Sequence, residues 1–238
     1  MNDKIVKFSL ILFLFIVSSC SNKSPVFGEN GMVVSTSRHA SQVGIDILQA
    51  GGNAIDAAAA VGFALAVTSS SNGNIGGGGF MTAKLANGEV FTLDYREMAP
   101  KSANRDMYLD KDGNIIKGKS RSTHFASGVP GSVDGLLKAW RDYGSGVISR
   151  DQLMGPAIKL AREGFDLSIY EAERFNKNKE RLSKHSETKR IFTRDDREWK
   201  KDDIRYFPED EERMKFFQDC KDALDQIGAK YVIVKGQG

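Results

Sequence analysis

Apolar residues recur at helical spacing in the first part of the chain. A stripe with the helical period runs through residues 40–48 and predicts an amphipathic helix that ends at Gly51–Gly52. The next segment, residues 54–67, is apolar nearly all round, which predicts a helix buried between layers. We expect Asn53 to cap that helix and Asp56 to place a carboxylate in its first turn.

Four later stretches carry helix or strand patterns. Residues 133–143 and 152–163 place apolar side chains along one face, which predicts two amphipathic helices. Residues 169–189 are highly charged and are expected to form helix on the surface. Residues 211–227 again have the helical period, and the apolar run 231–234 after them predicts a strand, as in a parallel α/β sheet.

Alternation of apolar and polar residues predicts a β-hairpin in the middle of the chain. Its strands are residues 80–85 and 89–93, and Asn87–Gly88 between them is typical of a type I′ turn, in which both central residues need positive φ. The return strand delivers Arg96 at its end. A separate apolar run, residues 32–35, predicts a short buried strand.

Four consecutive glycines, Gly76 to Gly79, precede the hairpin. Without Cβ atoms they can take positive φ and can let another backbone or a ligand approach closely. A glycine bend beside Arg96 is typical of a site for a small anion, but a tight structural turn with a solvated arginine gives the same pattern. The glycines are not followed by Lys-Ser/Thr, so a phosphate-binding loop is not predicted.

The N-terminus has the pattern of a targeting signal. Two lysines precede the apolar run 8–17, which is too short to span a bilayer as a mature helix. The run ends at Val17-Ser18-Ser19-Cys20, which resembles the bacterial lipobox, where cleavage leaves a cysteine that is then acylated. We expect a lipoprotein signal peptide over residues 1–20 and a tether over residues 21–30; the alternative is an ordinary signal peptide. Acylation of Cys20 would anchor the protein to a membrane of the bacterial cell envelope, facing the periplasm or the exterior.

Composition and charge narrow the classes of function. The 238 residues include 34 Lys+Arg and 31 Asp+Glu, and this near balance gives no nucleic-acid-binding footprint. Cys220 has no partner if Cys20 is acylated, so we expect no disulfide framework. The three histidines, His39, His124 and His185, lie far apart and lack metal-ligand spacing, so we expect neither a metal nor a cofactor.

Four motifs occur in one order and together closely resemble the start of the γ-glutamyltransferases (glutathione hydrolases). They are Gly51-Gly52-Asn53-Ala54-Ile55-Asp56-Ala57-Ala58, Gly73-Asn74-Ile75-Gly76-Gly77-Gly78-Gly79-Phe80-Met81, Asp94-Tyr95-Arg96-Glu97-Met98-Ala99-Pro100 and Ala126-Ser127-Gly128-Val129-Pro130-Gly131. Several long motifs in one order are far more specific than any one glycine run. The resemblance covers residues 31–203, which we interpret as the N-terminal part of the family's large subunit.

The resemblance implies an α/β (α+β) fold, the N-terminal-nucleophile hydrolase αββα sandwich of two packed sheets between helical layers, incomplete in this chain. Family precursors cut themselves into a large and a small subunit, and the new N-terminal threonine of the small subunit attacks the γ-glutamyl amide. The acyl-enzyme then passes to water or to an amino acid acceptor. Arg96 matches the family arginine that binds the α-carboxylate of glutathione and other γ-glutamyl substrates, a role that suits a planar guanidinium.

The second half of the family pattern is missing from this sequence. Thr188 and Thr193 lie in a charged stretch without the threonine motif, so we expect no catalytic nucleophile and no activity from this chain without the small subunit. The tail, residues 204–238, is unrelated to the family and weakly resembles a helix–strand unit of sugar-isomerase-type barrels. We interpret this change of pattern as the result of a truncated, rearranged or misassembled gene, which is a simpler explanation than a new function.

Three functions are therefore compatible with the sequence. The first is part of a γ-glutamyl-transferring enzyme. The second is a non-catalytic lipoprotein that binds γ-glutamyl or amino-acid ligands through Arg96. The third is an inert truncated or chimeric fragment.

Overall fold

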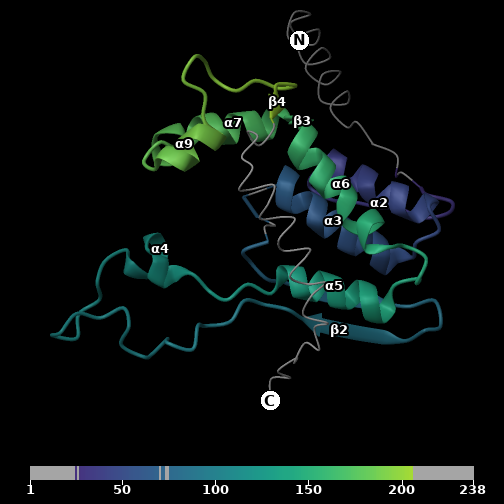
Figure 1. Cartoon of the computed structure of the whole chain (residues 1–238), viewed down its shortest axis with the longest axis horizontal. Helices are drawn as coiled ribbons and strands as arrows, with labels where there is room; N and C mark the ends of the chain where they lie inside the picture. Colours follow the sequence, from purple (N-terminus) through teal and green to yellow (C-terminus); the bar gives the residue numbers. More distant parts are fainter. Residues whose placement is uncertain (1–24, 26, 70, 73–74, 206–238) are drawn as a thin grey trace, which may run out of the picture. The chain divides into compact units, whose positions relative to one another are not determined.

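The computed structural model describes residue 25 and residues 27–69, 71–72 and 75–205 (Figure 1). Two compact units are distinguished, Met1–Met32 and Val33–Gly238, and every element named below lies in the second. The expected signal peptide with Cys20, and the helix and strand expected within residues 211–234, lie outside the described residues.

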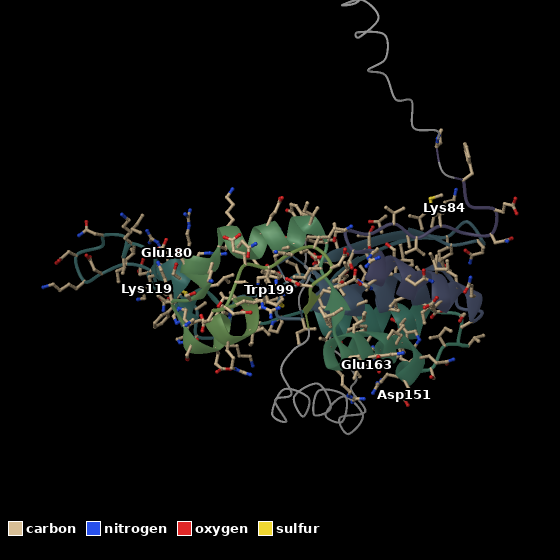
Figure 2. The ribbon with its side chains drawn as sticks, turned by 90° about the horizontal axis from the view of Figure 1, so that it is seen from above. Lys84, Lys119, Asp151, Glu163, Glu180 and Trp199 are labelled. Carbon is tan, nitrogen blue, oxygen red and sulfur yellow. The ribbon has the colours of Figure 1, made fainter. Side chains whose placement is uncertain are left out.

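Four helices form the core of the second unit: α2 (Arg38–Gln49), α3 (Ala54–Thr68), α5 (Ser132–Tyr143) and α6 (Arg150–Glu163). The central helix is α3, which contacts the other three. Ten of its residues are buried, on every side, as its continuous apolar sequence predicts. Figure 2 labels Asp151 and Glu163, near the two ends of α6. The helices predicted at residues 40–48, 54–67, 133–143 and 152–163 are confirmed.

Local capping sets where α3 begins. Asn53 caps the helix and Asp56 lies in its first turn, as the sequence predicts, and the two also form a reciprocal capping box. The Asp56 carboxylate is fully buried, and its Oδ2 accepts hydrogen bonds from the backbone N–H groups of Asn53 (2.8 Å) and Ser145 (3.0 Å). The Asn53 side chain donates to the carbonyl of Tyr143 at 2.8 Å. These contacts join the start of α3 to the end of α5, and a Cβ on Gly144 would lie only 2.5 Å from Asp56 Oδ1.

The predicted hairpin is confirmed as β1 (Phe80–Lys84) paired with β2 (Val90–Asp94), but its predicted turn type is wrong. Gly88 alone takes positive φ (87°), while Asn87 does not. The Gly88 N–H donates to the Leu85 carbonyl and the Leu85 N–H donates to the Glu89 carbonyl. A three-residue loop that ends in a left-handed glycine gives this pattern, so one positive φ is enough.

The predicted strand at residues 32–35 is also wrong. These residues form no strand, and among the described residues the pairs are β1 with β2 and β3 (Phe165–Asp166) with β4 (Ile204–Arg205). A strand needs a neighbour for its hydrogen bonds, and none of the described strands lies alongside this run. The Ser35 hydroxyl instead donates to the Ser37 carbonyl at 2.8 Å.

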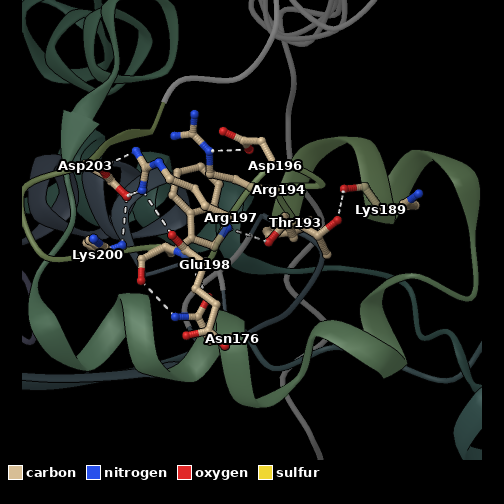
Figure 3. Close-up of polar contacts among 11 residues, drawn as sticks. Asn176, Lys189, Thr193, Arg194, Asp196, Arg197, Glu198, Lys200 and Asp203 are labelled. Atoms are coloured by element: carbon tan, nitrogen blue, oxygen red, sulfur yellow. Dashed lines mark hydrogen bonds and ion pairs between the residues drawn. The ribbon is translucent and has the colours of Figure 1, made fainter.

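The expected surface helix at residues 169–189 forms three shorter helices: α7 (Ile169–Lys177), α8 (Lys179–Leu182) and α9 (Ser186–Phe192). Side-chain hydrogen bonds connect the loop after α9 to α7 (Figure 3). Asn176 donates to the Trp199 carbonyl at 2.8 Å and accepts from the Trp199 N–H at 2.9 Å. Arg197 binds both oxygens of Asp203, and this guanidinium, with the Lys200 backbone N–H, holds the pKa of Asp203 well below its usual range.

That loop places β4 beside β3. The Leu167 N–H donates to the Asp203 carbonyl at 3.0 Å, and the Asp202 N–H donates to the Leu167 carbonyl at 2.9 Å. Ile204 and Arg205, the first residues of the segment expected to be an unrelated tail, therefore pair with a strand of the preceding part.

Candidate functional site

Arg96 lies just beyond the end of β2. The Asp94 carboxylate accepts a hydrogen bond from the Arg96 backbone N–H at 2.9 Å, which turns the chain where the strand ends. The residue is exposed, and its guanidinium forms no ion pair or hydrogen bond with any described residue. The structure thus leaves this cation available at the place where the sequence predicts an anion site.

The glycine run lies directly against this strand exit. Gly79 and Tyr95 exchange backbone hydrogen bonds of 3.4 and 3.0 Å, which extend the hairpin by one pair. A Cβ on Gly78 would lie 2.3 Å from the Glu97 backbone nitrogen, so this position requires glycine. Close backbone approach is therefore confirmed, whereas positive φ occurs at none of the four glycines 76–79, and that expectation is wrong.

The second glycine bend meets the first at the same point. The carbonyl of Gly77 accepts hydrogen bonds from the N–H groups of Gly131 (2.9 Å) and Ser132 (3.0 Å), at the start of α5. Met98 and Val129 exchange backbone hydrogen bonds of 3.0 and 2.8 Å. Three of the four sequence motifs, far apart along the chain, therefore meet around Arg96 and Glu97.

Tyr95 fills the space that the glycines leave. Cβ atoms on Gly79 and Gly135 would lie 2.8 and 2.0 Å from its side chain, and a Cβ on Gly131 would lie 2.1 Å from its carbonyl oxygen. Partial burial raises the pKa of the Tyr95 hydroxyl. A cavity of about 120 Å³ borders this ring, between α3, the glycine run and α5; it is lined by Gly62, Phe63, Leu65, Ala66, Ile75, Gly78, Tyr95, Ser132, Val133 and Leu136.

The sequence analysis assigns no role to Tyr95 or to the glycines of α5. A signal was present, because Gly131 and Gly135 are four residues apart and so share one face of a helix. The spacing of the two glycines does not predict which residue packs against them. That residue is Tyr95, which lies in a distant part of the sequence.

One further acid lies near the start of α5. Asp134 is in the first turn, and its Oδ1 is buried without a hydrogen-bond partner among the described residues. Burial raises the pKa of Asp134, and the opposing charges of Arg141 and Lys138 only partly offset this effect. The raised pKa favours the neutral form of the Asp134 carboxyl group. The exposed charge of the candidate site is therefore the Arg96 guanidinium, which stands on closely packed backbone.

The other groups considered in the sequence lie elsewhere. The Thr193 hydroxyl donates to the Lys189 carbonyl at 2.8 Å, as part of the end of α9. His39 Nε2 lies 3.0 Å from Asp166 Oδ1, yet burial and then the nearby Arg38 lower its pKa. No group of three or more His, Cys, Asp or Glu residues in the described ranges could hold a metal ion. None of the helices described here has the length and apolar character needed to cross a bilayer.

Arg96 can bind a carboxylate through its planar fork, and Tyr95, Gly78 and Gly131 fix the backbone that carries it. Neither threonine considered as a nucleophile belongs to this frame. The arrangement can therefore recognise an acidic ligand, while a covalent step would need a group from outside the described residues.

Comparisons with known proteins agree with the sequence motifs. The family model for gamma-glutamyltranspeptidase matches residues 40–211. The glutathione hydrolase proenzyme of Pseudomonas sp. (strain A14) is 55% identical over 154 residues, which are 65% of this chain and 26% of that protein. The corresponding proenzyme of Escherichia coli (strain K12) is 46% identical over 187 residues, 75% of this chain and 31% of that protein.

A solved structure is similar over most of the described fold. The crystal structure of Helicobacter pylori gamma-glutamyltranspeptidase matches with a TM-score of 0.72 and 39% identity, over 86% of this chain and 55% of that chain. The expected α+β class and the N-terminal-nucleophile hydrolase fold are thereby confirmed. This chain spans 26% and 31% of the length of the two proenzymes, so it matches only part of each.

The packing of Tyr95 against α5 gives a testable prediction. Gly135→Ala should lower stability by about 1–3 kcal/mol, because the new methyl group overlaps the tyrosine ring and the ring has to move. The matched control is Gly155→Ala in α6, where a Cβ would meet nothing within 4 Å apart from its own chain neighbours. That change should alter stability by less than about 0.5 kcal/mol, because the gain in helix propensity is offset by crowding of the new Cβ against the ring of Pro156, the next residue of the helix. Thermal or urea unfolding measures both; equal effects of the two substitutions would contradict the described packing.

Proposed function

The chain belongs to the gamma-glutamyltranspeptidase family, and we propose that it supplies the part of a γ-glutamyl-transferring enzyme that binds the substrate's α-carboxylate. The substrates would be glutathione and other γ-glutamyl compounds, and the acceptors would be water or amino acids. The observation that carries the proposal is the exposed guanidinium of Arg96, which pairs with no described residue and stands on a closely packed backbone.

Arg96 would bind the α-carboxylate of the γ-glutamyl group through two parallel N–H···O hydrogen bonds. This cation is not neutralised by a described residue, so it need not break an ion pair before it binds a ligand. The close contacts of Gly78 with Glu97, and of Gly131 with Tyr95, hold the backbone on both sides of it. Because these contacts already fix the backbone around Arg96, the site loses less conformational entropy when a ligand binds.

The covalent step would use a threonine that a small subunit supplies. Its hydroxyl oxygen would attack the γ-glutamyl amide carbon, and its own α-amine would take the proton. The amide C–N bond would break and the amine would leave with a proton, giving an ester that water or an amino acid then cleaves. In this scheme the present chain positions the substrate, and the small subunit is its partner.

Replacement of Arg96 tests the binding role. Arg96→Ala should weaken the affinity for L-glutamate or glutathione by about 10- to 100-fold, the loss of a charge-assisted hydrogen-bonded contact. Arg96→Lys should recover only part of this affinity, because an ammonium lacks the planar fork. The control is Arg162→Ala, which removes an exposed cation from α6. Isothermal titration calorimetry measures all four proteins, and equal affinities for Arg96→Ala and the control would refute the role.

Because the proposed scheme places the nucleophile on the small subunit, it predicts that this 238-residue chain alone has no turnover. Purified protein mixed with a chromogenic γ-glutamyl anilide should release no product beyond the background rate, because the covalent route needs the threonine nucleophile. A full-length relative such as the Escherichia coli proenzyme serves as the positive control. Steady product release by this chain alone would show that it carries a nucleophile of its own.

We also propose that the protein is a lipoprotein of the bacterial cell envelope, anchored through acyl chains on Cys20. Its support is the lipobox-like sequence Val17-Ser18-Ser19-Cys20 after a short apolar run. Each methylene buried in the bilayer would contribute roughly 0.8 kcal/mol to anchoring.

Two cysteine substitutions separate anchoring from other effects. Cys20→Ser should abolish incorporation of a labelled fatty acid in growing bacteria and move the protein out of the membrane fraction. Cys220→Ser is the matched control and should keep both the label and the membrane location. Label that persists in Cys20→Ser would show that this cysteine is not the acylated residue.

A further inference from the structure

A second cavity lies between the end of α3 and the helices α7 to α9, of which α3, α7 and α9 are labelled in Figure 1. Its volume is about 640 Å³, and we call it the α7 cavity. One wall is polar and consists of residues just before α2 or just after α3: Thr36, Ser69, Ser71 and Asn72. The described residues that line it include neither Arg96 nor Tyr95, so the proposed function gives this cavity no role.

The opposite wall combines positive charge with apolar surface. Arg174 of α7 and Arg181 of α8 supply two guanidinium groups, and Arg174 Nη1 donates to the Tyr170 hydroxyl at 3.2 Å. Three partly buried apolar side chains lie on the same wall: Phe175, Leu182 and Phe192. This wall is therefore complementary to an occupant that carries both apolar and acidic side chains.

The C-terminal tail has this complementary composition. Residues 206–227, here called the acidic segment, contain seven Asp or Glu residues and three Lys or Arg residues. Four of the acids are consecutive, from Glu209 to Glu212. Residues 169–192, which form α7 to α9, contain seven Lys or Arg residues and four Asp or Glu residues. Opposite net charges favour the association of these two parts of the chain.

The acidic segment also has an apolar stripe. The helix predicted from the sequence at residues 211–227 places Met214, Phe217, Leu224 and Ile227 along one side. Cys220 lies on the same side, three residues after Phe217 and four before Leu224. A helix of this kind gains most of its stability in a protein when the stripe is buried.

The start of the tail brings the acidic segment close to the α7 cavity. Arg205 is paired with Phe165, and Ser168, which lines the cavity, is only three residues further along the chain and so lies within about 11 Å of Phe165. The five residues 206–210 span up to about 17 Å when they are extended. A connection this short raises the effective concentration of the segment to the millimolar range, which favours it over a second copy of the chain.

We propose that the acidic segment docks into the α7 cavity of its own chain. The run Glu209 to Glu212 pairs with Arg174 and Arg181, and the apolar stripe packs on the apolar side chains of the same wall. Although its sequence is expected to be unrelated to the family, the tail is then an integral part of this chain's core. This inference goes beyond the proposed function and does not depend on it.

The reactivity of Cys220 measures docking. In a full chain with Cys20→Ser, Cys220 is the one cysteine, because the sequence contains two. Docking covers its side of the helix, so a maleimide should label the folded chain at least about tenfold more slowly than the chain unfolded in urea. The labelling rate constant should not change over a hundredfold range of protein concentration, because the docking is intramolecular.

Charge reversals on both sides locate the contact. Arg174→Glu with Arg181→Glu should raise the labelling rate about tenfold. Lys177→Glu with Lys184→Glu is the matched control, which changes the net charge equally but replaces residues that do not line the cavity. Glu211→Lys with Glu212→Lys should act like the arginine variant, although it leaves every described residue unaltered. Combining the two pairs restores opposite charges and should restore slow labelling.

Three results would overturn the proposal. The first is labelling of the folded chain as fast as that of the unfolded chain. The second is equal labelling rates in the arginine variant and the lysine control. The third is labelling that slows as the protein concentration rises, which would mean that a second copy provides the segment. If the arginine variant has a lower unfolding temperature, the tail variant and the combined variant decide the outcome.

Binding of L-glutamate separates this proposal from the proposed function. Calorimetry on the same proteins should give the arginine variant the affinity of the unaltered chain, and Arg96→Ala should keep slow labelling of Cys220. Slow labelling in a chain that binds no glutamate would support docking and count against the proposed function. Arg96-dependent binding in a chain with fast labelling would do the reverse.

Discussion

Close backbone packing around Tyr95 is the constraint on which the rest of the site depends. Cβ atoms at Gly78, Gly79, Gly131 or Gly135 would each overlap Tyr95 or Glu97, so the strand exit, the glycine run and α5 can meet only where those atoms are missing. The meeting of these segments sets where Arg96 leaves the hairpin. A single steric requirement thus fixes the position of the proposed ligand site.

The sequence was most informative where structure depends on neighbouring residues. The stripe of α2 and the continuous apolar character of α3 predict both helices, and the capping of α3 by Asn53 and Asp56 follows from residues three positions apart. The hairpin was found for the same reason, but Asn87–Gly88 fits two turn geometries. The two geometries differ in loop length and in the sign of φ at Asn87, neither of which composition alone determines.

Features that depend on distant partners were not predicted. The apolar run at residues 32–35 has a strand composition, yet a strand also requires a hydrogen-bonding neighbour, and no described strand provides one. Tyr95 and Gly135 are in contact although forty or so residues separate them, and the local sequence around neither residue predicts this contact. Arg96 was identified as a candidate from its place beside the glycine bend and from the family motif that contains it, and its contact with a substrate carboxylate stays a prediction.

The buried carboxylate of Asp56 has a consequence for how this part of the chain can evolve. It joins two helices through backbone groups, and it occupies the space that a side chain at residue 144 would need. A Cβ at residue 144 would also lie 2.2 Å from the backbone carbonyl oxygen of Trp140, an atom that no substitution at residue 56 removes. Glycine is therefore required at residue 144 whatever replaces the acid, and libraries that vary both positions would gain nothing there over libraries that vary residue 56 alone.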